Sequence, residues 1–105
     1  MSESALERQI ARSDIPVLLD VWAPWCGPCR AMAPAYEAAA GELEPSFRLL
    51  KLNSEAEPAA AARLNVRGIP TLILFRGGNE QARQSGAMTA AQIVAWVRSQ
   101  ETSAT

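Results

Sequence analysis

Apolar and polar positions alternate with two different periods along the chain, and these periods predict an ordered series of helices and strands. Leu6 and Ile10 are spaced as on one face of a first short helix, which should end before Pro16. The next segment, 17–22, is apolar at every position except Asp20. Such a run predicts a strand that is covered on both faces and therefore lies inside a sheet.

The middle of the chain predicts a helix between two strands. Residues 26–43 are rich in Ala, Met and Glu, which favours a long helix, and residues 47–53 predict a second strand. Because a helix connects them, the two strands should be parallel. Ser54 and Glu57 have the spacing of a capping box and predict a short helix that runs to about Leu64.

The C-terminal part predicts a hairpin followed by a helix. Residues 71–75 are apolar, the turn residues 77–79 follow, and residues 80–85 are so polar that they predict an edge strand. Thr89 and Gln92 have capping-box spacing before the last helix. The whole order predicts an α/β domain spanning residues 1–105, with a mixed sheet of about four strands between two layers of helices.

The composition of the chain excludes some classes of partner but does not indicate a function. The chain has 105 residues, 49% of them hydrophobic and 20% charged, which is typical of one globular domain. Its net charge of −1 and lack of a basic run give no electrostatic footprint for nucleic acid. No apolar run approaches the length of a membrane span, and residues 1–4 do not resemble a secretory signal. We therefore expect a cytoplasmic protein without nucleic-acid or membrane partners.

The candidate chemistry lies in the only two cysteines, Cys26 and Cys29, because the chain contains no histidine. They stand between the predicted strand and the long helix, in the sequence Trp-Cys-Gly-Pro-Cys. The spacing permits a static disulfide, half of a zinc site or a redox dithiol. A pair supplies only two of zinc's four ligands, and so short a loop gains little from a disulfide. The helix N-terminus favours a thiolate at Cys26, and therefore favours the redox interpretation.

Two charged residues on neighbouring predicted strands are candidates to assist the cysteines. Asp20 lies in the buried strand, where desolvation should raise its pKa and suit it to accept a proton from Cys29. The alternative is a carboxylate that only hydrogen-bonds to the backbone. Lys51 either pairs with Asp20 and tunes it or is an ordinary solvated lysine.

Several separated motifs, in the right order, resemble the thioredoxin family. Residues 25–29 match the family's active-site motif at every position, and residues 68–71, Gly-Ile-Pro-Thr, resemble its substrate-binding turn. The resemblance covers about residues 6–98. Residues that stand where the family has its buried acid, a nearby lysine and a glycine are Asp20, Lys51 and Gly86.

This resemblance implies a thioredoxin-like three-layer sandwich and a thiol–disulfide oxidoreductase that reduces protein disulfides. It implies that Cys26 attacks, that Cys29 resolves the mixed disulfide, and that an NADPH-dependent thioredoxin reductase resets the pair without any other bound cofactor or metal. Most X–Pro bonds are trans, but the resemblance implies a cis Ile69–Pro70 bond beside the sulfurs. The residues implied to shape the site or bind substrate are Trp25, Gly27, Pro28, Ile69, Pro70, Gly86 and Lys51.

The sequence also departs from the family pattern. Residues 22–25, Arg30 and residues 53–55 lean toward the bacterial thioredoxin-2 subgroup, but the cysteines of that subgroup's zinc module are absent. The family's first strand, which would pair with residues 47–53, is absent too, so we expect a free sheet edge and a monomer or weak dimer. Ser85 stands before Gly86 where an apolar residue is expected.

Two other functions remain open from the residues alone. One is a disulfide oxidase or isomerase, although such relatives usually have a histidine between the cysteines, where this chain has Gly27 and Pro28. The other is a thioredoxin-like binding module whose dithiol is idle. The redox potential would separate the first from a reductase, and catalytic turnover would separate the second.

Overall fold

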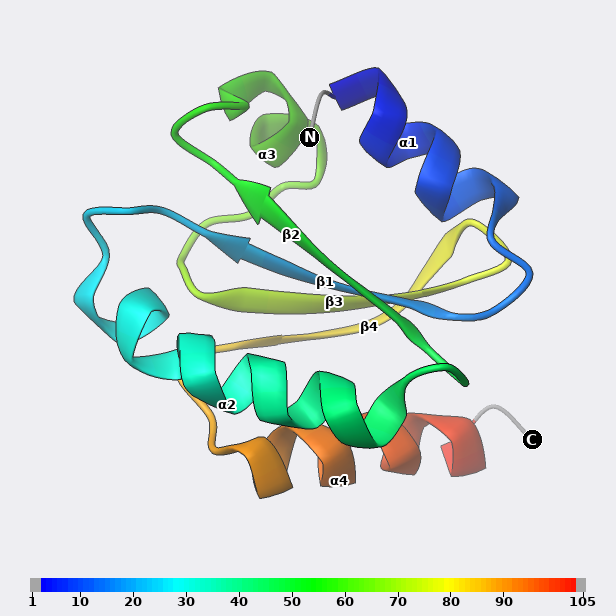
Figure 1. Ribbon diagram of the computed structural model, residues 1–105. Helices are drawn as coiled ribbons and strands as arrows, with labels where there is room; N and C mark the ends of the chain where they lie inside the picture. The colour runs from blue at the N-terminus through cyan, green and yellow to red at the C-terminus, as the bar shows by residue number, and fades with distance from the viewer. Residues whose placement is uncertain (1–2, 104–105) are drawn as a thin grey trace.

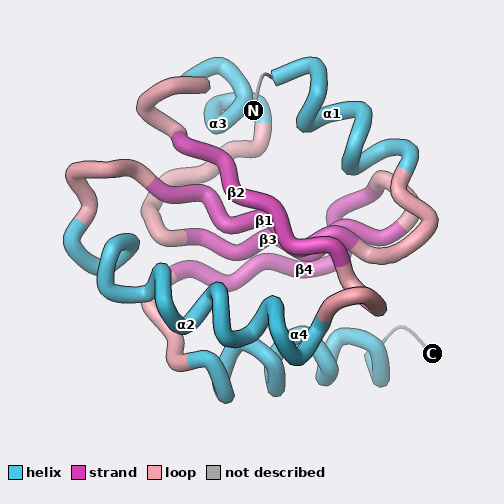
Figure 2. The backbone as a smooth tube through the Cα atoms, in the orientation of Figure 1, coloured by secondary structure: helices cyan, strands magenta, loops and turns pink. Residues whose placement is uncertain are grey.

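The chain folds as a mixed four-stranded sheet between two layers of helices (Figure 1). The structure is a computed structural model that describes residues 3–103. Helices α1 and α3 cover one face of the sheet, and α2 and α4 cover the other (Figure 2). The elements in chain order are α1 (Glu3–Arg12), β1 (Val17–Trp22), α2 (Gly27–Leu43), β2 (Arg48–Asn53), α3 (Pro58–Arg63), β3 (Thr71–Arg76), β4 (Asn79–Ser85) and α4 (Ala90–Ser103).

The sheet has the order β2-β1-β3-β4. Strand β1 runs parallel to β2 and antiparallel to β3, and β4 completes a hairpin with β3. The predicted buried strand is therefore confirmed as a central one, and the predicted polar strand is confirmed as an edge. Strand β2 forms the other edge, and within residues 3–103 no strand lies on its outer side.

Alternation along β1 divides the core into two halves. Leu18 contributes to the half beneath α2 and α4, which also contains Ile93 and Val97 of the last helix. Leu19, its neighbour, contributes to the half beneath α1 and α3, together with Leu6. A period of two on a strand covered from both sides explains why the segment reads as a continuous apolar run.

The two predicted capping boxes have opposite outcomes. At α4 the prediction is confirmed, because the Gln92 N–H donates to Thr89 Oγ1 at 3.1 Å and the Thr89 N–H donates to Gln92 Oε1 at 2.9 Å. At α3 it is wrong, because the helix begins at Pro58, whose fixed φ suits a first turn. The Ser54 hydroxyl instead donates to the Trp22 carbonyl at 3.0 Å, and so fastens the end of β2 to the end of β1.

Tyr36 of α2 connects its helix to the two parallel strands, which the sequence analysis did not foresee. Its hydroxyl is 2.9 Å from the carbonyl oxygen of Leu18 and 2.7 Å from that of Leu50. The side chain is buried, and burial raises the pKa of the Tyr36 hydroxyl well above its usual value, so the group remains a donor. The bond therefore stabilises the position of β2 beside β1.

Removing this hydroxyl should loosen the β2 edge. We expect Tyr36→Phe to lower the free energy of unfolding by about 1–3 kcal/mol, because the buried hydroxyl that joins α2 to the carbonyl oxygens of Leu18 and Leu50 is lost. Urea unfolding measures this loss, and amide hydrogen exchange should be faster in β2 than in β3. An unchanged free energy of unfolding, with unchanged exchange in β2, would contradict the assignment.

Candidate active site

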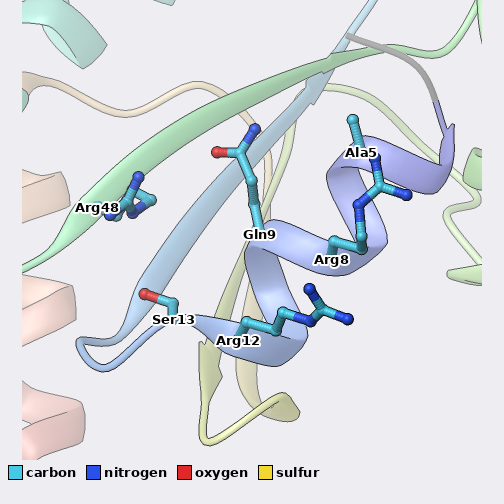
Figure 3. Close-up of a pocket in the computed structure, with 6 residues that line it drawn as sticks. All are labelled: Ala5, Arg8, Gln9, Arg12, Ser13 and Arg48. Atoms are coloured by element: carbon cyan, nitrogen blue, oxygen red, sulfur yellow. The ribbon is translucent and has the colours of Figure 1, made fainter.

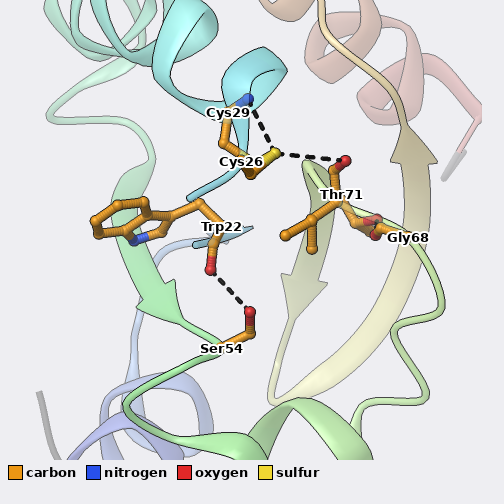
Figure 4. The surroundings of a disulfide bond; sticks show 7 residues. Trp22, Cys26, Cys29, Ser54, Gly68 and Thr71 are labelled. Carbon is orange, nitrogen blue, oxygen red and sulfur yellow. Dashed lines mark hydrogen bonds between the residues drawn. A yellow bond between two sulfur atoms is a disulfide. The ribbon is translucent and has the colours of Figure 1, made fainter. Parts of the chain in front are cut away.

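The cysteine pair lies where the loop after β1 enters α2 (Figure 4). Cys26 and Cys29 form a disulfide, with their Cα atoms 5.3 Å apart. Both side chains are nearly covered, since Cys26 is 5% exposed and Cys29 is 3% exposed. They pack with Ala23, Trp22 and Ile69 in a small apolar cluster that is separate from the two halves of the core.

The sulfur of Cys26 occupies the position of a helix-capping acceptor. Cys26 is the N-cap residue of α2, and the Cys29 N–H donates to its Sγ at 3.2 Å. No acidic residue stands in the first turn, so no carboxylate competes with the sulfur for the helix dipole. When Cys26 is reduced, the same N–H and dipole stabilise a negative charge on its sulfur.

The turn at Pro70 lies against the disulfide. The Ile69–Pro70 bond is cis, as the family resemblance implied, and the carbonyl oxygen of Ile69 is 3.9 Å from Cys26 Sγ. The Gly86 N–H donates to the Pro70 carbonyl oxygen at 2.9 Å, so the end of β4 is held beside the same turn. Gly86 has a φ of +100°, which explains why glycine stands there.

The hydroxyl groups of Thr71 and Ser85 stabilise the turn at Pro70. Thr71 is 1% exposed, its Oγ1 donates to the Gly68 carbonyl oxygen, and it lies 3.0 Å from Ser85 Oγ. Ser85, which stands where the family has an apolar residue, therefore makes a polar contact between β3 and β4. The sequence analysis placed Thr71 in the predicted substrate-binding turn but did not foresee its contact with Ser85, which depends on the pairing of β3 with β4.

Asp20 is buried in β1 and is only 1% exposed. Among residues 3–103, its Oδ1 finds no hydrogen-bond partner. Burial raises the pKa of Asp20 from 3.8 to about 6, against the opposing charge of Lys51. Desolvation outweighs the attraction because a buried carboxylate loses its hydration while Lys51 keeps its own at the surface.

Lys51 stands level with Asp20 on β2 but does not form an ion pair with it in the described part of the chain. Its Nζ lies over the ring of Trp22, 4.8 Å from the centroid. The side chain is exposed, so its effect on Asp20 is a lowering of the pKa through space. Of the two alternatives for Lys51, the ion pair with Asp20 does not form among the described residues, and the exposed ammonium instead makes a cation–π contact with Trp22.

Apolar side chains flank the cysteine pair. Trp25 is 68% exposed, whereas the neighbouring Trp22 packs partly into the cysteine cluster. Ile69 is partly buried against the same cluster. Within residues 3–103, no three His, Cys, Asp or Glu side chains gather as they would around a metal ion, and no helix combines the length and hydrophobicity of a membrane span.

Comparison with known proteins gives the same family for almost the whole chain. The Thioredoxin family profile matches residues 1–99. A thioredoxin of Acidithiobacillus ferridurans is 40% identical over 100 residues, which is 95% of this chain and 93% of that protein. The thioredoxin of Haemophilus influenzae is 38% identical over 97 residues, covering 92% and 91% of the two chains. The thioredoxin of Porphyra purpurea is 39% identical over 88 residues, covering 84% and 82%.

These relatives do not distinguish the thioredoxin-2 subgroup, which stays a prediction. With an oxidised Cys26–Cys29 pair at a strand-to-helix junction, and with matches along its length, the chain belongs to the thioredoxin family and is a thiol–disulfide oxidoreductase of the protein-disulfide reductase type.

Proposed function

We propose that this single domain reduces protein disulfides in two exchange steps. The Cys26 thiolate attacks one substrate sulfur, and the other substrate sulfur leaves as a thiolate. Cys29 then attacks Cys26 Sγ, which releases the second substrate thiol and leaves the Cys26–Cys29 disulfide. Two electrons pass to the substrate. The observation that carries the proposal is the position of Cys26 Sγ as acceptor of the Cys29 N–H at the start of α2.

Thiolate stabilisation explains only part of the rate. Thioredoxins are themselves the standard example of the effect, with a nucleophile pKa of about 7 against about 8.5 for a free cysteine. At neutral pH this raises the thiolate fraction about fifteen-fold, while the lower basicity slows attack about five-fold. The net gain is about three-fold, so most of the rate must come from substrate placement and from the nearby second thiol.

Asp20 acts as the proton acceptor that activates Cys29. A carboxyl group with a pKa of about 6 is mostly ionised at neutral pH, yet it is basic enough to take a proton from a thiol. Its unpartnered Oδ1 is available for that proton. Lys51 keeps the pKa from rising further, and so keeps the acceptor charged before the resolving step.

Substrate binds as an extended segment across the Pro70 turn. The backbone of Ile69 pairs with the segment in the manner of strand addition, and Trp25 supplies exposed apolar contact. Gly27 and Pro28 keep the start of α2 free of bulky side chains. A Cβ placed on Gly86 would meet no atom within 4 Å, so the space beside it is open to a substrate backbone.

The spent disulfide is returned to the dithiol by an NADPH-dependent thioredoxin reductase in the cytoplasm. The domain carries no other cofactor, because both electrons reside on its two sulfurs. A reducing compartment keeps such a dithiol available for the next substrate.

The two cysteines should fail in different ways. We expect Cys26→Ser to lower the reduction of insulin by dithiothreitol to the uncatalysed rate, because the remaining thiol, Cys29, is buried. Cys29→Ser should accumulate a mixed disulfide with substrate, visible as a covalent adduct by mass spectrometry. If the Cys26→Ser variant forms mixed disulfides through Cys29 as fast as the Cys29→Ser variant forms them through Cys26, the assigned roles are wrong.

The double variant, Cys26→Ser with Cys29→Ser, separates the reductase from a binding module. It should retain the fold and lose all turnover. Coupling of the unmodified protein to a bacterial thioredoxin reductase and NADPH should give continuous insulin reduction. If the unmodified protein binds its partners but gives no turnover, the dithiol is idle and the proposed function is wrong.

Asp20→Asn should slow resolution and, at the same time, stabilise the fold. Between about pH 4 and pH 6 the folded state keeps a proton that the unfolded chain releases, so stability falls as pH rises through this window. Above it the ionised carboxylate costs about 3 kcal/mol, which the variant regains. Urea unfolding at about pH 8 and pH 3.5 should show the gain only at the higher pH.

The kinetic consequence is slower decay of the mixed disulfide in Asp20→Asn. The exposed Asp14→Asn serves as a matched control that should change neither property. A variant that gains stability but resolves mixed disulfides at the unmodified rate would show that Asp20 is not the proton acceptor.

Trp25→Ala should weaken substrate use without weakening the fold. We expect kcat/KM for insulin to fall about five- to tenfold, the usual effect of losing one aromatic contact. The melting temperature should be unchanged, because the side chain is 68% exposed. Trp25→Phe should restore most of the activity, and an unchanged kcat/KM in Trp25→Ala would exclude this contact.

A further inference from the structure

Strand β2 is an edge strand, and alternate residues along it point their main-chain N–H and C=O groups away from β1. The Arg48 N–H donates to the Pro16 carbonyl oxygen, and the Ser54 N–H donates to that of Trp22. Main-chain groups alternate in direction along a strand, so residues 48, 50 and 52 bond to β1. Residues 49, 51 and 53 therefore point their N–H and C=O groups away from the sheet.

Most of these outward groups have no hydrogen-bond partner in the part of the chain that the structure describes. The Leu49 N–H donates to the Glu44 carboxylate at 3.3 Å, and the Asn53 carbonyl oxygen accepts the Glu57 N–H at 3.0 Å. Within residues 3–103 the other outward groups of Leu49, Lys51 and Asn53 form no hydrogen bond. Half-buried Leu49 and Leu50 add apolar surface to this edge. Such an edge can accept one more strand.

A cluster of arginines, which we call the arginine triad, lies beside the same edge. Arg8 and Arg12 come from successive turns of α1, and Arg48 comes from β2. They line a hollow of about 400 Å³ with Ala5, Gln9 and Ser13 (Figure 3). No ion pair joins any of the three to an acid in the described part of the chain. The lining of this hollow therefore carries three positive charges and no negative one, although the whole chain has a net charge of −1.

We propose that this edge binds an acidic, extended segment of a partner protein as an additional strand beside β2. The segment's main chain pairs with Leu49 and Lys51, and its carboxylates, at alternate positions, face the arginine triad. A strand added at the usual spacing of about 4.8 Å runs along the hollow. The Glu44 carboxylate on the Leu49 N–H is an example, within the chain, of an acid meeting this edge.

A second copy of the chain is a poorer occupant of the edge. Strand β2 carries Arg48 and Lys51 and no acidic residue. Pairing two copies through β2 would place no acidic side chain of the strand opposite Arg48 or Lys51, so neither positive charge would gain a partner. The positive charges of this edge therefore favour an acidic strand over self-association.

This surface is separate from the redox site. Arg48 is level with Val17 at the start of β1, whereas Trp22, at the end of β1, leads into the cysteine loop. A partner bound at the arginine triad leaves the cysteines open. The inference goes beyond disulfide reduction and does not depend on it, so its test uses the oxidised protein and no redox reaction.

The probe is a blocked eight-residue peptide that alternates Val and Glu, compared with one that alternates Val and Lys. In an NMR titration only the Glu peptide should shift the amide signals of Leu49, Lys51 and Asn53. The double variant Arg8→Glu/Arg12→Glu should bind it at least about tenfold more weakly. The double variant Arg67→Glu/Arg98→Glu makes the same change of charge at two exposed arginines outside the hollow. It is the matched control and should bind nearly as well as the unmodified protein.

N-methylation of the peptide tests whether it binds as a strand. Only alternate residues of an added strand turn their N–H toward β2. Methylation of one set of residues, all Val or all Glu, should therefore abolish binding, and methylation of the other set should not. Loss of binding with methylated Val indicates an antiparallel strand, and loss with methylated Glu indicates a parallel one. If both methylated peptides bind like the parent, or if the arginine variants bind it equally well, the proposal is wrong. A stable β2-paired dimer of the free protein in light scattering and hydrogen exchange would also overturn it.

Discussion

Strand β1 lies between β2 and β3 and is covered by helices on both faces, and the position of the redox site depends on this burial. Five of its six residues are fully buried, and the strand leads directly into the loop that carries Cys26. Apolar side chains fill both halves of the core, so the end of the strand and the start of α2 are fixed relative to each other. A polar side chain in this strand is held at a cost in free energy, and Asp20 is that side chain.

The start of α2 shows how local backbone chemistry creates reactivity. A helix N-terminus needs an acceptor for its unpaired N–H groups, and here the acceptor is Cys26 Sγ. The group that satisfies the helix is therefore also the group that must become negative during catalysis. Placing Cys29 one turn later puts the second sulfur within disulfide reach of the first.

Periodicity and capping chemistry predicted most of the fold, because both are local. The alternation of apolar residues located β1, and the Thr89–Gln92 pair located the start of α4. The capping box at Ser54 failed because α3 begins only at Pro58. The Ser54 hydroxyl instead donates to the Trp22 carbonyl oxygen on β1, and that contact depends on strand register. Contacts set by register, such as the Tyr36 hydroxyl on two strands, leave no local signal.

The candidate site could be predicted from the sequence because its motif is local, whereas the arginine triad could not. The cysteine motif is contiguous, whereas the arginine triad joins residues forty positions apart on α1 and β2. Lys51 connects the two regions. Its main chain points out from the β2 edge, its ammonium lies over Trp22, and its charge opposes the burial of Asp20. An apolar residue at this position would pack against Trp22 equally well but would leave the Asp20 carboxylate without a nearby positive charge, so the edge strand contributes to the electrostatics of the proton acceptor as well as to the sheet.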